Sequence, residues 1–362
     1  MKRIHLIISM FAFLLSCGGD AVYRIEGRLS NLEDQLVYAV FESEDRNVID
    51  TVACHKPGQF KIERNKEDFK QVTLLFEDKT LWFTVYLTDT DDKITVTGDM
   101  KYPTLLHAKG GHLNNELSSI RKTFAPMLKE REDLLNIQKS NPIDPNDITS
   151  RLANVNHQLS EEALAYIHER PEETASVVLI KTFLLNPDDT RQLDELLIML
   201  NPELKDFFLV KELEQYSERA KRTSLGAEAP NFTVKNIYGK AVSLDSFPQK
   251  YLLLTFTAPW CDMCRTDDLF LDEIDGKYDD KQLEQLLVSL DDDMQTLKEV
   301  LKKDSIHWNL VTDSAGQATM MLDLYNVSAL PRCFLIDEEG KIILKTDNGM
   351  EIKQTLENLI TN

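Results

Sequence analysis

The chain has 362 residues, of which 42% are hydrophobic, so it can bury sizeable cores and is not a wholly disordered protein. Its 61 acidic and 41 basic residues give a net charge of −20, which argues against nucleic-acid binding because that function needs clustered Lys and Arg. No apolar stretch is long enough to cross a bilayer as a helix, so no conventional membrane span is predicted.

The N-terminus has the pattern of an export signal. A basic start, MKR, is followed by an apolar stretch at 4–15, which suits a signal-peptide core and is too short to cross a bilayer. Cys17 follows directly after Leu-Leu-Ser, which resembles a bacterial lipoprotein signal. We predict that residues 1–16 are the signal peptide and that acyl chains on Cys17 anchor the protein in the cell envelope, facing the periplasm. A plain secretory signal with an incidental cysteine is the alternative.

Residues 17–111 are predicted to form an N-terminal β domain. Short runs rich in Val, Leu, Thr and aromatic residues are separated by turn signals, and they lie at 35–41, 71–76, 81–87 and 93–98. This spacing favours a small antiparallel sandwich or barrel. No residue pattern here indicates catalysis, and we interpret Cys54 as structural.

Residues 112–223 are predicted to be helical. Apolar residues recur every three or four positions along 113–138 and 147–171, and the two prolines between these segments end one helix before the next. Two more helices are predicted at 173–185 and 190–200. His157 and His168 have no partner at ligand spacing, so we predict neither a metal site nor a cofactor. The region is interpreted as a spacer or docking module.

Residues 224–362 alternate between strand and helix patterns. The predicted strands lie at 250–257, 284–290 and 307–313, the predicted helices follow Cys261 and cover 293–303 and 315–327, and a hairpin at 332–346 precedes a last helix. Such alternation predicts a mostly parallel central sheet covered by helices on both faces.

The stretch PWCDMC places Cys261 and Cys264 where a buried strand ends and a helix is predicted to begin. A helix N-terminus stabilises a thiolate, and a spacing of three lets the two sulfurs reach bonding distance. A structural zinc site would need two further ligands, usually a second CxxC or HxxxH, and the sequence has neither. A redox pair is therefore favoured over half of a metal site.

Two other residues complete the candidate site. Pro331 starts a predicted strand far downstream of Cys261, and a cis-proline there would hold its loop opposite the sulfurs. The backbone at Leu330 could then pair with an extended substrate. Trp260 offers a flat apolar surface beside the nucleophile, or else packs on the following helix.

The C-terminal segment carries several motifs of one family, which are GAEAPNF at 226–232, YGKAVSLDSF at 238–247, LLLTFTAPWCDMC at 252–264, LYNVSALPRCFLID at 324–337 and EEGKII at 338–343. It resembles the TlpA/ResA-like class of exported thioredoxin-fold thiol–disulfide oxidoreductases. The preceding regions resemble the β domain and helical region of Bacteroidetes lipoproteins of this kind. The resemblance implies that Cys261 is the nucleophile, Cys264 the resolving thiol, and Pro331 the cis-proline, with a redox-active Cys261–Cys264 disulfide.

Five positions depart from that pattern. Thr255 stands where thioredoxin has a buried aspartate, and Leu269 stands where a helix proline is expected. Asp267 replaces a glutamate common in exported relatives, and we predict that it carries the proton of the resolving thiol. Arg332 could stabilise a thiolate or select acidic substrates, whereas Cys333 is interpreted as a strand residue. A peroxiredoxin is excluded because Ala258 stands where the peroxide-orienting Thr or Ser is required.

These observations predict a lipid-anchored envelope reductase of protein disulfides. Acidic groups near Cys261, among them Asp262, should raise the pKa of its thiol and favour a dithiol that gives electrons away. Its expected partners are protein thiols and disulfides of the envelope, with a membrane or periplasmic thiol protein as electron donor. The alternative is a non-catalytic envelope binding module in which the CxxC is a structural disulfide.

Overall fold

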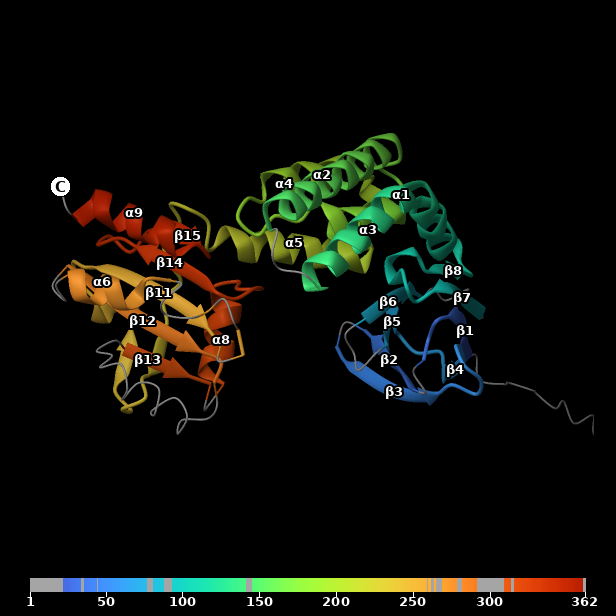
Figure 1. Cartoon of the computed structure of the whole chain (residues 1–362), viewed down its shortest axis with the longest axis horizontal. Helices are drawn as coiled ribbons and strands as arrows, with labels where there is room; N and C mark the ends of the chain where they lie inside the picture. The colour runs from blue at the N-terminus through green and yellow to red at the C-terminus, as the bar shows by residue number, and fades with distance from the viewer. Residues whose placement is uncertain are drawn as a thin grey trace, which may run out of the picture. The chain divides into compact units, whose positions relative to one another are not determined.

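The computed structural model describes residues 22–33, 36–43, 45–76, 81–87, 93–140, 145–258, 260–261, 264, 269–278, 282–291, 309–313 and 316–360. The chain divides into two compact units, Met1–Ser176 and Val177–Asn362 (Figure 1). Among the helices of the described residues, none combines the length and the apolar character needed to cross a membrane.

The first unit contains two four-stranded sheets. One has the order β4-β1-β7-β8, from β4 (Gln59–Asn65), β1 (Val22–Ser30), β7 (Lys93–Asp99) and β8 (His107–Lys109). The other has the order β3-β2-β5-β6, from β3 (Asn47–Ala53), β2 (Leu36–Glu42), β5 (Gln71–Phe76) and β6 (Leu81–Tyr86). Alternate residues of both sheets, such as Ile25 and Phe60 of the first and Phe41 and Phe76 of the second, share one core.

The predicted all-β domain is therefore confirmed, with one difference in strand direction. Strand β1 runs parallel to β7, whereas the other described pairs of the two sheets are antiparallel. The sequence analysis did not single out β1, β3, β4 or β8. In β1 the buried residues alternate with Arg and Glu, so the strand lacks the apolar run that identified the others.

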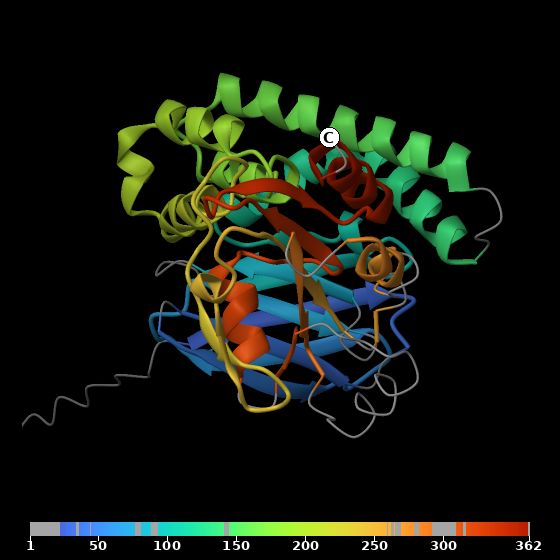
Figure 2. The ribbon, with the colours of Figure 1, turned by 90° about the vertical axis from the view of Figure 1, so that its left-hand side faces the viewer.

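The predicted helical region is confirmed as five α-helices among its described residues, α1 (His112–Ser140), α2 (Pro145–Glu169), α3 (Thr174–Phe183), α4 (Arg191–Met199) and α5 (Phe208–Lys221). The long helices α1 and α2 pack side by side (Figure 2). The sequence analysis did not separate α5, whose buried residues Leu209, Leu213 and Ala220 lie at helical spacing.

The second unit is built on a five-stranded sheet of order β13-β12-β11-β14-β15. Its strands are β13 (Asn309–Thr312), β12 (Leu283–Ser289), β11 (Tyr251–Thr257), β14 (Arg332–Ile336) and β15 (Ile342–Thr346). The first three are parallel, and β14 and β15 form the antiparallel hairpin that the sequence predicts. A short hairpin, β9 (Thr233–Lys235) with β10 (Ala241–Ser243), precedes β11.

Helices cover both faces of this sheet (Figure 1). Leu252, Leu254 and Phe256 of β11 share a core with α8 (Gln317–Leu324). Leu253, on the other face, shares a core with α6 (Leu271–Lys277) and α9 (Gly349–Ile360). Because successive residues of β11 are buried on opposite faces of the sheet, the strand is apolar along its whole length.

The helix predicted directly after Cys261 falls mostly on residues outside the described part of the chain, and the structure tests only its continuation to Tyr278. Among the described residues, α6 begins only at Leu271, and Phe270 before it has a left-handed backbone with φ of 55°. A left-handed residue cannot continue a right-handed helix, so the apolar spacing from Cys264 to Tyr278 is not that of one helix. The helix predicted at 293–303 lies outside the described residues.

A cluster of aromatic rings fills the core on the α8 side of the sheet. Tyr325 is fully buried, with its ring centroid 5.8 Å from that of Phe256 and 5.3 Å from that of Phe334. Its hydroxyl donates a 2.8 Å hydrogen bond to the carbonyl of Pro230. Burial raises the pKa of Tyr325 well above its usual range, so the hydroxyl stays protonated and can keep donating. The cluster joins β11 to β14, the two strands that lead to the candidate site.

We expect Tyr325→Ala to lower the free energy of unfolding of this unit by about 3–5 kcal/mol, because it removes a buried ring. Tyr325→Phe keeps the ring and leaves the Pro230 carbonyl unpaired, so a loss of about 1 kcal/mol is expected. Urea unfolding followed by tryptophan fluorescence measures both in a Trp82→Phe background, where the remaining tryptophans lie in the second unit. Exposed Tyr238, changed to Phe, is the control. Equal losses for both Tyr325 variants would contradict the role given to the ring.

Candidate active site

The pairing of two strands brings the predicted site residues to one edge of the sheet. Strands β11 and β14 are antiparallel, with Phe256 opposite Arg332, so the end of β11 lies beside the start of β14. Cys261 follows shortly after the end of β11, and Pro331 directly precedes β14. Two segments that are far apart in the sequence thus leave the sheet at the same edge.

Cys261 and Cys264 are joined by a disulfide bond with an S–S distance of 2.08 Å. The amide of Cys261 donates to the carbonyl of Ala258 at 3.1 Å, and the amide of Cys264 donates to the carbonyl of Cys261 at 3.0 Å. The hydroxyl of Thr257 donates to the carbonyl of Cys264 at 3.4 Å. Cys264 is 7% exposed whereas Cys261 is only half-buried, so Cys261 is the more accessible of the two residues.

Pro331 and Trp260 lie on the two segments that meet at this edge. The Leu330–Pro331 peptide bond is cis, and Pro331 is buried. Trp260, adjacent to Cys261, is 71% exposed, so its ring is not packed into the protein interior. It presents an apolar surface to solvent beside the disulfide.

Three predicted residues lie outside the described part of the chain. These are Asp267, the predicted proton carrier, Asp262, and Cys17, the predicted lipidation site. Their roles stay predictions from the sequence.

Cys333 lies two residues after Pro331. Its buried environment makes its thiol far less reactive than an exposed thiol. It pairs in register with Thr255 of β11 and points into the core that α6 and α9 cover. Burial raises the pKa of the Cys333 thiol to about 12, so the thiolate needed for disulfide exchange does not form near neutral pH. Its interpretation as a strand residue agrees with this environment.

Arg332, directly after the cis-proline, belongs to an ionic cluster. Its guanidinium lies 3.5 Å from the carboxylate of Asp188, in the loop between α3 and α4. Lys345 of β15, whose side chain is 3% exposed, lies 3.2 Å from the same carboxylate and donates a 2.8 Å hydrogen bond to the carbonyl of Pro187. Burial lowers the pKa of Lys345, and Asp188 opposes that shift. The α3–α4 loop is thereby bound to the strands beside Pro331.

This ionic cluster was not predicted from the sequence, from which Arg332 was expected to stabilise a thiolate or to select acidic substrates. The structure instead pairs Arg332 with Asp188, a residue much earlier in the chain. Asp188 lies in a polar loop that no motif distinguishes from other surface loops. Only the fold shows that the largely buried side chains of Arg332 and Lys345 converge on its carboxylate.

Comparison with known proteins identifies the segment that carries this site. A model of the Redoxin family matches residues 224–360, and a model described as Domain of unknown function (DUF4369) matches residues 23–117. Thiol-disulfide oxidoreductase ResA of Bacillus cereus is 30% identical over 142 residues, which are 39% of this chain and 80% of that protein. The chain belongs to the TlpA/ResA-like family of thioredoxin-fold proteins.

Other relatives match a similar share of this TlpA/ResA-like chain. ResA of Bacillus subtilis is 28% identical over 120 residues, which are 33% of this chain and 65% of that protein. A solved thiol-disulfide oxidoreductase from Bacteroides fragilis is 30% identical, covers 37% of this chain and 99% of its own, and has a TM-score of 0.34. A thioredoxin-like protein from Bacteroides caccae is 18% identical, covers 59% and 83%, and has a TM-score of 0.44.

The raised pKa of Cys333 leads to a labelling prediction for this TlpA/ResA-like protein. After reduction of the disulfide, Cys261 should react with iodoacetamide in the native chain, while Cys333 should react on the order of 100-fold more slowly than in denaturant. Because its pKa lies near 12, raising the pH from 8 to 10 should leave Cys333 largely unlabelled. Peptide mass spectrometry measures each site, with half-buried Cys54 as an internal comparison. Equal native labelling of Cys333 and Cys261 would show that Cys333 is accessible.

Proposed function

We propose that this protein reduces disulfides of other proteins through Cys261 and Cys264. The observation that carries the proposal is the disulfide at the sheet edge, with the more accessible Cys261 next to exposed Trp260 and with cis-Pro331 directly before the adjoining strand. An accessible first cysteine and a buried second cysteine suit attack on an external disulfide followed by internal release.

In the proposed cycle the reduced protein acts as a two-electron donor. The Cys261 thiolate attacks one sulfur of a substrate disulfide, which forms a mixed disulfide and releases the other substrate sulfur as a thiolate. The Cys264 thiol then loses its proton and attacks Cys261, which releases the second substrate sulfur. One substrate disulfide is reduced to two thiols, and the Cys261–Cys264 disulfide forms with the same two electrons given up. A dithiol protein of the envelope must reduce it again.

The proton of Cys264 needs an acceptor, because its side chain is buried and a thiol does not attack efficiently. Thr255 stands where thioredoxin has a buried aspartate, and a threonine hydroxyl cannot accept this proton because it does not ionise near neutral pH. We assign this role to Asp267, which follows Cys264 closely in the sequence.

The negative charge of the domain supports a Cys261–Cys264 pair that donates electrons to its substrates rather than taking electrons from them. Residues 224–362 contain 24 acidic and 13 basic residues, a net charge of −11, which disfavours a thiolate on Cys261. Strong oxidants of this chemistry depend on a stabilised thiolate in their reduced form.

Location and partners belong to the same proposal. The signal pattern ending at Cys17 supports export and lipid anchoring in the bacterial envelope, with the domain facing the periplasm. Its substrates would be oxidised envelope proteins, and its electron donor would be a thiol protein in the membrane or the periplasm.

The exchange step predicts that Cys264→Ser protein, once reduced, forms mixed disulfides with envelope proteins that persist because the release step is blocked. Non-reducing gels followed by mass spectrometry should find them linked through Cys261. Cys261→Ser is the matched control and should trap none, while Cys333→Ser should reduce insulin at the wild-type rate. If neither trapping nor insulin reduction is seen, the CxxC is a structural disulfide of a non-catalytic envelope binding module.

The direction of electron flow has a separate test. We expect the Cys261–Cys264 couple to have a reduction potential closer to that of thioredoxin, about −270 mV, than to that of DsbA, about −120 mV. Equilibration with defined glutathione or dithiothreitol mixtures, followed by acid quenching and thiol labelling, measures it. A potential near the DsbA value would contradict the reductase direction and leave an oxidant in its place.

A further inference from the structure

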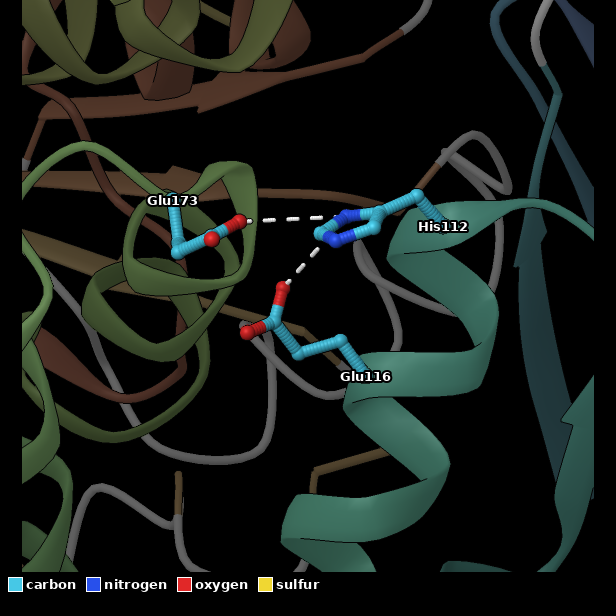
Figure 3. A group of neighbouring side chains, drawn as sticks. All are labelled: His112, Glu116 and Glu173. Atoms are coloured by element: carbon cyan, nitrogen blue, oxygen red, sulfur yellow. Dashed lines mark ion pairs between the residues drawn. The ribbon is translucent and has the colours of Figure 1, made fainter.

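A group of metal-ligating side chains lies in the first unit, in a part of the chain to which the proposed redox function gives no role. His112 is the first residue of α1, and Glu116 lies one turn later on the same face. Glu173 comes from the turn between α2 and α3, directly before α3 begins. Figure 3 shows the imidazole of His112 facing both carboxylates.

The separations suit one small cation. Nδ1 of His112 lies 3.8 Å from Oε2 of Glu116 and 3.8 Å from Oε2 of Glu173. The three ligand atoms all lie within 4.8 Å of one another. Zinc bonds of about 2.0–2.2 Å to nitrogen and oxygen place tetrahedral ligands roughly 3.4 Å apart, so each carboxylate needs to move only a few tenths of an ångström toward Nδ1 of His112.

The two oxygens of Glu116 have different surroundings. Oε1 accepts a hydrogen bond from the Tyr166 hydroxyl and lies 3.7 Å from the guanidinium of Arg170. Oε2 is buried and accepts no hydrogen bond from the described residues, in a side chain that is only 12% exposed. A buried carboxylate oxygen without a donor is costly, and this one is turned toward His112 and Glu173. Tyr166 and Arg170 therefore orient the carboxylate through Oε1, as outer-shell groups orient a metal ligand. Oε2 remains available to bind a metal ion.

The charges of the cluster also favour a cation. Glu116 and Glu173 bring two carboxylates together beside His112. The guanidinium of Arg170 lies near Oε1 of Glu116, the oxygen that does not face His112.

We propose that His112, Glu116 and Glu173 bind one divalent transition-metal cation, for which Zn²⁺ is the probe. One imidazole and two carboxylates are ligands that zinc accepts, and three protein ligands leave a further position for water. The 75% exposure of the His112 side chain gives the ion a path from solvent. Bound metal would join the start of α1 to the turn that leads into α3. The proposal is independent of the redox function.

Calorimetric titration of ZnCl₂ into the metal-stripped full-length chain tests this proposal. The Cys261–Cys264 disulfide is kept oxidised, so that its thiolates cannot bind the ion. We expect one saturable site per chain, with affinity at least tenfold lower in His112→Ala and in Glu116→Gln. The matched control is His168→Ala, which removes an exposed histidine of α2 outside the cluster and should leave the affinity unchanged.

Melting temperatures with and without zinc provide a second test, which remains informative if a variant is less stable than the wild type. Zinc should raise the melting temperature of the wild-type chain and of His168→Ala, and the shift should be lost in His112→Ala, whose substituted side chain is exposed. Circular dichroism in EDTA checks that each variant is folded. No saturable binding, or binding of equal affinity in wild type and His112→Ala, would overturn the site.

Discussion

The antiparallel pairing of β11 with β14 is the constraint on which the candidate active site depends. Backbone hydrogen bonds between the two strands align Phe256 with Arg332, and this register decides which residues leave the sheet together. Cys261 continues from one strand and Pro331 leads into the other. A one-residue slip would turn every side chain of β14 to the opposite face, placing Cys333 among the aromatic rings and Phe334 against Thr255.

Side-chain contacts on the face of the sheet that carries Phe256 and Phe334 keep that register in place. Tyr325 packs against rings from both strands, and the ion pairs of Arg332 and Lys345 with Asp188 bind the α3–α4 loop to β14 and β15. Removing the Asp188 carboxylate would leave Lys345, which is almost entirely buried, with a charge compensated mainly by a backbone carbonyl. Helices α4 and α5, with most of α3, thus belong to the compact unit that contains the disulfide, which begins at Val177.

Prediction from sequence succeeded where the determining interactions are local. The strand–helix alternation of the C-terminal region and the all-β character of the N-terminal region are properties of neighbouring residues, and both are confirmed. It failed at β1, whose alternating polar residues obscured a strand that is buried on one side, and where it extended one helix from Cys264 to Tyr278. There the apolar spacing continues through Phe270, but its left-handed backbone ends any helical run before α6. Residue spacing does not report the backbone angle of a single residue.

By itself the sequence determined the CxxC pair, the proline far downstream of it, the family to which the C-terminal region belongs and the acidity of that region. The tertiary structure alone decided that the Cys333 thiol is buried with a raised pKa and that Arg332 is paired with Asp188. It alone brought Glu173 to the His112 side chain. The physical reason is that burial and ion pairing depend on distances between segments far apart in the chain, whereas motif spacing records only neighbours along it.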